Sequence, residues 1–492
     1  MDRDAFRAAA HATVDRICDY YETLEARPVT AQVERGYLAP RLPSEAPDQG
    51  EPWSAIIGDY DKHILPGMTH WQHPMFFGFF PANATYEGIL ADMLACMTNN
   101  PAFNWNASPA VTELEFVVLD WVAKMLGLSS DFLSLDTSHN GGGIIFGSAS
   151  EATLTLAVAA RERAIERLAT ARGVTPDTMR SEVLPRLVLY CTEQTHSSAR
   201  KAAQILGLTC RVLPVYRHDA YALRGATLRD ALARDQEAGL VPFYLVATYG
   251  TTNTCAIDAL AELADARRDA PLLWLHVDAA YGGVALSVPE YRDAHLAAIN
   301  AHVDSFSTNL HKWGLVPFES SPTFVRDRAP LVQALTLTPA YLASKGGEDL
   351  VSDLRNMQIS LGRRFRALKV WMVLRSYGVH GFQQHIRDHV ALAEAFVARI
   401  KSYPQIEVPI APRWGLVVLR VSRPGLDEAQ TEALNQAWVQ ALGAHSANLL
   451  LTPTVVPGIG TCVRWVVGSV VTRIEHIERA AALMGACAEA LP

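Results

Sequence analysis

Short apolar runs alternate with helical patterns through the middle of the chain. Runs such as "RLVLYC", "PFYLVATYG" and "LLWLHVDAA" are continuously apolar, which is typical of strands that are buried on both faces. Segments with apolar residues at helical spacing separate these runs, near 197–206, 227–238 and 258–268. This order predicts an α/β fold with a mostly parallel sheet covered by helices. In such folds functional groups gather at the carboxyl ends of the strands.

Two longer helices are predicted before this alternation. The stretch "TELEFVVLDWVAKMLG" has apolar residues at helical spacing, and Gly127 can end that helix. The segment 151–172 is predicted to form a second helix, with Ser150 as a possible N-cap and Gly173 as its end.

Changes of pattern near both ends divide the chain into three predicted parts. A Pro- and Gly-containing segment at 39–52 follows a first helix, and after Arg363 two helices precede further apolar runs and a last helix. The predicted parts are an N-terminal helical arm and dimerisation segment at 1–88, a large domain at 89–370 and a small α/β C-terminal domain at 371–492.

Composition narrows the class of protein. Hydrophobic residues make up 49% of the 492 residues, so a large buried core is expected. The net charge of −8 argues against nucleic acid or an anionic membrane as a partner, because both require a basic surface. Seven scattered cysteines with no C-x-x-C pair fit a reducing compartment. Without a signal peptide or an apolar run of membrane-spanning length, we expect a soluble cytoplasmic protein.

Three candidate functional residues follow predicted strands, and one glycine-rich stretch precedes a predicted helix. Asp278 closes "LLWLHVD", Lys312 follows "VDSFSTN", and Thr252 follows "PFYLV". The stretch "HNGGGIIFGSASEA" offers backbone N–H groups and serine hydroxyls for a phosphate. Each feature alone has a commoner explanation: a turn, a helix cap or a solvated lysine. Neither a G-K-[ST] phosphate loop nor a G-x-G-x-x-G dinucleotide motif is present.

Together these features suit pyridoxal phosphate. Lys312 could bond the cofactor aldehyde if burial keeps its amine partly neutral. Asp278 could hold a proton on the pyridine nitrogen, which makes the ring an electron sink. His196, in "EQTHSSAR", could stack on the ring, although a capping or core histidine is the better explanation of that residue by itself.

Several ordered motifs give the sequence a strong resemblance to the group II pyridoxal-phosphate-dependent decarboxylases, in particular the aromatic L-amino-acid decarboxylase family. The motifs are "PGMTHWQHPMFFGFFPAN", "NWNASPAVTELE", "GGGIIFGSASEAT", "HVDAAYGG", "NLHKW" and "LGRRFRALKVW". The resemblance covers essentially the whole chain. It implies the type I pyridoxal-phosphate fold, with an N-terminal arm, a large sheet domain and a C-terminal domain, in a homodimer with shared active sites.

The resemblance also implies roles for individual residues. Lys312 would bond the cofactor, Asp278 would pair with the pyridine nitrogen, and His196 would stack on the ring. Other cofactor contacts would come from Ser148, Ala149, Ser150, Thr252, Ala280, Asn309 and His311. The wall of the substrate pocket would include Trp71, Phe80, Pro81 and Phe103.

The reaction implied is decarboxylation of an aromatic amino acid to its amine. Tyr341, in a predicted loop that contains Gly346 and Gly347, matches the tyrosine that the family uses as general acid. Related enzymes with phenylalanine there, or asparagine in place of the stacking histidine, make aldehydes instead. Because this chain has Tyr341 and His196, we favour the simple decarboxylase over an aldehyde synthase.

Substrate choice rests on fewer residues. Gly362 matches a position where related plant enzymes have glycine for indolic and serine for phenolic substrates, so tryptophan or hydroxytryptophan is favoured over tyrosine, dihydroxyphenylalanine and phenylalanine. Ala82 and Phe79 replace hydroxyl-bearing residues of many animal members, and no role is assigned to them. A decarboxylase of a non-aromatic amino acid and an inactive homologue that serves as a binding protein are two less favoured hypotheses. His70 and His73 lack further ligands, so no metal site is expected.

Overall fold

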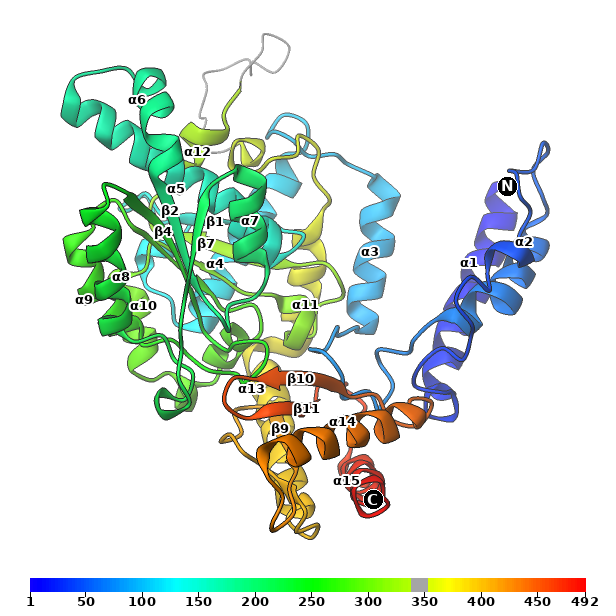
Figure 1. Cartoon of the computed structure of the whole chain (residues 1–492). Helices are drawn as coiled ribbons and strands as arrows, with labels where there is room; N and C mark the ends of the chain where they lie inside the picture. The colour runs from blue at the N-terminus through cyan, green and yellow to red at the C-terminus, as the bar shows by residue number, and fades with distance from the viewer. Residues whose placement is uncertain (338–352) are drawn as a thin grey trace. The chain divides into compact units, whose positions relative to one another are not determined.

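The structure, a computed structural model, describes residues 1–337 and 353–492 (Figure 1). The contacts within these residues divide the chain into two compact units. The first unit contains Met1–Pro81, Ala391–Val455 and Ile459–Pro492, and the second contains Ala82–Val390 and Val456–Gly458. This grouping puts both ends of the chain in one unit, whereas the sequence pattern separates them. The boundaries near residues 88 and 370 stay predictions.

The second unit is built on a seven-stranded sheet with the order β1-β7-β6-β5-β4-β2-β3. The neighbouring pairs from β6 to β3 are parallel, and β7 runs antiparallel to both of its neighbours. The strands are β1 (Gly142–Phe146), β2 (Leu187–Thr192), β3 (Thr209–Leu213), β4 (Val241–Thr248), β5 (Trp274–Asp278), β6 (Ser305–Ser307) and β7 (Ser321–Val325). The predicted α/β fold with a mostly parallel sheet is confirmed.

Most helices of the second unit pack in groups around this sheet, whereas α3 stands apart from it (Figure 1). Helix α5 contacts α6, α7, α12 and several strands, while α9 lies between α8 and α10. The helices are α3 (Tyr86–Thr98), α4 (Pro109–Leu126), α5 (Ala149–Arg172), α6 (Pro176–Val183), α7 (Ser198–Leu206), α8 (Gly225–Glu237), α9 (Leu260–Ala266), α10 (Ala294–His302), α11 (Leu310–Trp313) and α12 (Ala329–Leu335).

Local chemistry explains most of these boundaries. Every residue of β2 and β5 is buried, as expected for continuously apolar strands. Helix α4 ends at Gly127, as predicted, and α5 ends at Gly173, whose φ of 66° is a conformation that glycine adopts without a Cβ penalty. The start of α5 differs from the prediction. Its N-cap is Ser148, not Ser150, and the Ser148 hydroxyl accepts the N–H of Glu151.

The glycine-rich stretch is not a single loop. Its central part forms the fully buried strand β1, which pairs antiparallel with β7. The turn that precedes α5 is therefore confined to Gly147 and Ser148. Three consecutive glycines before the apolar residues hide this strand in the sequence, because glycine weakens any strand pattern.

The first unit has its own four-stranded sheet, in the order β10-β11-β9-β8. Trp465 of β11 stacks on Phe396 at a ring-centroid distance of 4.1 Å, and both side chains are fully buried. The elements are α1 (Arg3–Glu22), α2 (Trp53–Asp59), β8 (Ile406–Glu407), β9 (Leu416–Val421), α14 (Glu428–Ala444), β10 (Thr452–Val456), β11 (Gly460–Val466) and α15 (Ile474–Glu489).

The long segment α13 (Arg366–Ile400) is broken at Gly378, where φ is 62° and ψ is 172°. This break agrees with the two helices predicted from the sequence. None of the helices among the described residues combines the length and apolar character that a membrane span requires.

Candidate active site

Four of the predicted site residues follow neighbouring strands of the large sheet. Lys312 follows β6, Asp278 ends β5, Thr252 follows β4 and His196 follows β2. These strands are adjacent and parallel, so their carboxyl ends meet at one edge of the sheet. At about 4.8 Å per strand interval, the four strand ends span about 14 Å. The topology therefore brings these residues to one edge of the sheet, as the sequence predicts.

Backbone hydrogen bonds continue the ladder beyond the strand ends. The Tyr249 N–H donates to the carbonyl of Asp278 at 2.9 Å, and the Ala279 N–H donates to Ser307 at 2.9 Å. The Asn309 N–H donates to Ala280 at 3.1 Å. The loops that follow β4, β5 and β6 are thus fixed to one another before any side chain is considered.

Asp278 is held in one orientation. Its side chain is buried, and Oδ1 accepts the N–H of Ala280 at 2.9 Å. Among the residues that the structure describes, Oδ2 accepts no hydrogen bond, so one carboxylate oxygen is available for a ligand. A buried carboxylate with a fixed rotamer suits a cationic N–H group as its partner.

Lys312 lies in the one-turn helix α11, shortly after Asn309. Its backbone N–H donates to the Asn309 carbonyl at 3.1 Å, and the Asn309 side-chain oxygen accepts the Ser321 hydroxyl at 2.8 Å. The next residue, Trp313, is fully buried, stacks on Tyr281 at 5.0 Å and donates its indole N–H to His389 at 2.9 Å. This buried indole anchors the short helix and so limits where the lysine can lie.

His196 is within electrostatic reach of both charged groups. Its Nδ1 accepts the Ser198 N–H at 3.2 Å, so the neutral ring carries its proton on Nε2. Partial loss of hydration lowers the pKa of His196. The positive charge of Lys312 lowers this pKa further, and the negative charge of Asp278 opposes the shift. The imidazole is therefore neutral near pH 7, as a ring that stacks on an aromatic ligand should be.

The start of α5 completes this edge of the sheet. Glu151 accepts the Gly147 N–H at 3.0 Å, while Ser148 caps the Glu151 N–H. Ala149 and Ser150 are the first two residues of a 24-residue helix, so their N–H groups have no intrahelical acceptor. The N-terminus of a long helix favours an anion such as a phosphate group.

His276 supports the site and was not singled out from the sequence. It shares a face of β5 with Asp278 because side chains two residues apart in a strand point the same way. Its Nδ1 lies 2.9 Å from the Ser305 hydroxyl, and burial lowers its pKa to about 4. The motif "HVD" could have indicated this residue in the sequence, because a polar side chain two residues before Asp278 in a buried strand requires a hydrogen-bond partner.

The His311 side chain is buried and packs against neighbouring residues of the protein. Its Nδ1 accepts the Ser320 N–H at 2.9 Å, and its ring lies edge-on to Phe318 at 4.8 Å. Burial, followed by the charge of Lys312, lowers its pKa to about 4. The His311 ring is therefore held by Ser320 and Phe318.

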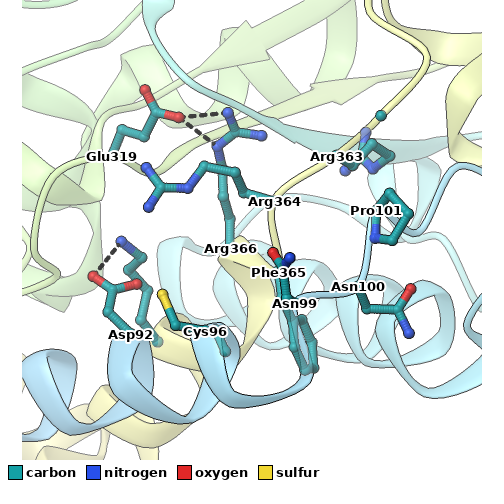
Figure 2. A pocket seen from close by; sticks show the side chains of 13 residues that line it. Asp92, Cys96, Asn99, Asn100, Pro101, Glu319, Arg363, Arg364, Phe365 and Arg366 are labelled. Atoms are coloured by element: carbon teal, nitrogen blue, oxygen red, sulfur yellow. Dashed lines mark hydrogen bonds and ion pairs between the residues drawn. The ribbon is translucent and has the colours of Figure 1, made fainter. Parts of the chain in front are cut away.

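Gly362 lines a cavity of about 500 Å³ in the second unit (Figure 2). The cavity is lined by α3, the segment that follows it and the segment that leads into α13. Two ion pairs, Lys369 with Asp92 at 2.9 Å and Arg366 with Glu319 at 2.5 Å, flank it (Figure 2). A Cβ added at Gly362 would meet no atom within 4 Å, so a larger side chain fits there.

The remaining substrate-wall residues are divided between the units. In the first unit, Phe80 lies under Arg464 at 4.9 Å, and Pro81 packs so closely on Gly468 that a Cβ there would lie 2.2 Å from it. Trp71 stacks on Phe79 at 5.4 Å. Phe103 belongs to the second unit. Tyr341 lies outside the described residues.

Comparison with known proteins identifies the family. The model of the pyridoxal-dependent decarboxylase conserved domain matches residues 35–422. The chain belongs to this family. Its cofactor is therefore pyridoxal phosphate, and its enzyme class is that of the carboxy-lyases.

Named relatives narrow the family further. An aromatic-L-amino-acid decarboxylase of Cavia porcellus is 43% identical over 89% of this chain and 90% of its own length. A phenylacetaldehyde synthase of Arabidopsis thaliana is 40% identical over 98% of this chain and 95% of its own length. A crystal structure of Oryza sativa TDC with PLP and tryptamine superposes with a TM-score of 0.92 at 36% identity, over 99% of this chain and 98% of that one. The resemblance to the aromatic-L-amino-acid decarboxylases and the type I fold are thereby confirmed.

The residues of this decarboxylase fit its cofactor. A buried carboxylate with one oxygen available, a neutral imidazole, a lysine and a helix N-terminus meet at one edge of the sheet. They match the ring nitrogen, the ring face, the aldehyde and the phosphate of pyridoxal phosphate in chemical type.

The buried histidines predict how stability depends on pH. An unfolded histidine binds a proton below about pH 6.5, whereas folded His276 and His311 bind one only near pH 4. Between these values the unfolded chain holds more protons. The free energy of unfolding should therefore fall as pH drops from about 6.5 to about 4, by on the order of 3 kcal/mol for each histidine.

Urea unfolding at pH 7.5, 6 and 5 measures this effect. His276→Gln should flatten the pH dependence, and His218→Gln should leave it unchanged because that side chain is 77% exposed. An unfolding midpoint that stays constant between pH 7 and pH 5 would contradict the assignment.

Proposed function

We propose that this enzyme decarboxylates an aromatic L-amino acid to the corresponding amine and carbon dioxide, with tryptophan or a hydroxytryptophan preferred. The observation that carries the proposal is the meeting of Lys312, Asp278 and neutral His196 at the ends of adjacent strands, in a chain whose relatives are named for aromatic substrates. Seven free cysteines fit a cytoplasmic location.

Each residue of the site has one task in this proposal. Pyridoxal phosphate, when bound, supplies the electron sink that accepts the electron pair of the broken bond. Lys312 would hold the cofactor through its aldehyde. Asp278 would keep a proton on the ring nitrogen through its available Oδ2. His196 packs against the ring, and Ala280 lies beside the Asp278 carboxylate on the same loop.

The phosphate is assigned to the start of α5 and to the loop that follows β6. Ala149 and Ser150 offer backbone N–H groups there, the Ser148 and Ser150 hydroxyls can rotate toward the anion, and Asn309 lies on the loop that carries Lys312. His311 acts through the position of α11, because its Nδ1 contacts Ser320. Thr252 supports the β4 side of the ring.

Tyr341 is assigned to proton transfer. Its phenol donates the proton that reaches the substrate Cα after carbon dioxide leaves. An aldehyde synthase is the second candidate function, because the Arabidopsis thaliana relative carries that name. The presence of Tyr341 and His196 favours the decarboxylase over the synthase.

A product assay separates the two functions. Purified enzyme loaded with pyridoxal phosphate should release amine from tryptophan, without stoichiometric hydrogen peroxide or ammonia. In air, Tyr341→Phe should lower amine formation and raise aldehyde, ammonia and peroxide together, because without the proton donor dissolved oxygen would accept the two electrons and become peroxide. Lys312→Ala should lose both products and the visible absorbance of the bound cofactor. Aldehyde and peroxide from the unchanged enzyme would overturn the decarboxylase proposal.

Gly362 is proposed to favour the larger indole ring. The space at its Cα accepts a side chain without backbone movement, so Gly362→Ser changes the cavity rather than the fold. We expect the variant to lower kcat/KM for tryptophan relative to tyrosine by about tenfold, which is the size of effect that one added or missing group has on the discrimination between two substrates.

Gly443→Ser is the matched control for this measurement, because a Cβ at that exposed position also meets no atom within 4 Å. Equal tryptophan-to-tyrosine ratios for wild type and Gly362→Ser would remove Gly362 from the specificity assignment.

We also propose a homodimer with shared active sites. Helix α3 exposes an apolar stripe at helical spacing, which consists of Tyr86, Leu90, Met93, Leu94 and Met97. Monomeric proteins rarely expose contiguous apolar patches of this kind. The pairing of identical stripes in a symmetric dimer would bury it.

The double variant Leu90→Glu/Met97→Glu should shift the protein from dimer to monomer in sedimentation velocity and lower amine formation with it. Val174→Glu, an equally simple change at an exposed site away from α3, should leave the dimer intact. A wild-type protein that sediments as a monomer would contradict the proposal.

A further inference from the structure

A second polar cavity lies at the opposite edge of the large sheet from the candidate active site. It has a volume of about 360 Å³ and is lined by residues of α5, α9 and the segments that precede β5 and β6. Because β5 runs from Trp274 to Asp278, the two edges are about 13 Å apart along this strand. We call this cavity the arginine pocket.

Positive charge exceeds negative charge in the arginine pocket. Four arginines line it, namely Arg163, Arg167, Arg267 and Arg268. Two aspartates, Asp265 and Asp304, are the acids among its lining residues, which leaves a formal excess of two positive charges when His302 is neutral. This local positive excess contrasts with the net charge of −8 of the whole chain.

The two aspartates do not satisfy the four guanidinium groups. Asp304 is shared, since it pairs with Arg163 at 3.3 Å and with Arg267 at 2.5 Å. Asp265 pairs with Arg268, but both side chains are more than half exposed, so water and salt screen this pair. Arg167 forms no ion pair with any residue that the structure describes, and its hydrogen bond to the Pro271 carbonyl is long, at 3.4 Å.

Arg163 is a largely buried residue in the lining of the pocket. Its guanidinium lies 4.3 Å from the ring centroid of Trp274, and its Nε is buried without a hydrogen-bond acceptor among the described residues. Burial lowers its pKa, while the charge of Asp304 opposes this shift and the nearby Arg167 and Arg267 add to it. The indole and the long contacts of the terminal guanidinium nitrogens, at 3.3 Å to Asp304 and 3.4 Å to the Leu272 carbonyl, hold this planar cation in place at the pocket, where a charged acceptor could compete for the terminal N–H groups.

We propose that the arginine pocket binds a small anion that carries phosphoryl groups. Guanidinium forks match phosphate oxygens in pairs, and the excess of two positive charges matches a phosphate dianion. The volume lies in the range of small-molecule sites. The Arg163 and Arg167 side chains supply the central contacts. Arg268 gives up its solvent-screened ion pair with Asp265 and contacts the anion from the solvent side. This site is independent of the proposed reaction.

Calorimetric titration with inorganic pyrophosphate tests the proposal. The protein is saturated with pyridoxal phosphate, so the start of α5 is not the site of binding, and the visible absorbance of the cofactor should not change. We expect one saturable site per chain and an affinity that falls with added salt. Arg167→Gln should weaken binding about tenfold, the loss of one charge-assisted hydrogen bond.

Arg229→Gln is the control, because it removes the same charge from an exposed position on α8. Equal weakening by both variants, or no saturable binding by the wild type, would overturn the site. Inorganic phosphate and citrate are titrated in parallel. Tighter binding of pyrophosphate than of citrate supports the phosphoryl class, and equal or tighter binding of citrate overturns it.

Discussion

The register of the central parallel strands is the constraint on which the candidate active site depends. Side chains far apart in sequence meet because β6, β5, β4 and β2 end together at one edge. Three backbone hydrogen bonds past the strand ends, from Tyr249, Ala279 and Asn309, then join the loops to one another. A slip of one residue in β5 would turn Asp278 to the opposite face of the sheet.

The protonation states of two buried histidines near this edge also support the site. His276 and His311 are neutral because burial penalises their cations, and each has a serine partner that satisfies Nδ1. A cationic His276 two residues from Asp278 would compete for the carboxylate. With the histidines neutral, the charge of Asp278 stays available to a ligand, and the charge of Lys312 contributes to lowering the pKa of His196.

Sequence patterns predicted the features that depend on local chemistry. Continuous apolar runs indicated the parallel strands, and the polar residues at or after the ends of these runs indicated Asp278, Lys312 and Thr252. Ser148, three residues before Glu151, fits a capping box better than Ser150 does, so the correct cap was present in the sequence. Strand β1 was missed because glycines mask it, and its antiparallel partner β7 depends on pairing that no local pattern records.

The arginine pocket could not be predicted, because its residues come from positions 163 to 304 and meet only through the fold. The ends of helices explain part of it. Arg267 caps the end of α9 and His302 is the last residue of α10, where the carbonyl dipoles favour cations. Arg163 and Arg167 lie well inside α5, beyond the reach of its terminal dipole. Arg163 shares Asp304 with Arg267, and Arg167 forms no ion pair with the described residues, so the charge of Arg167 is left to water or to a bound anion.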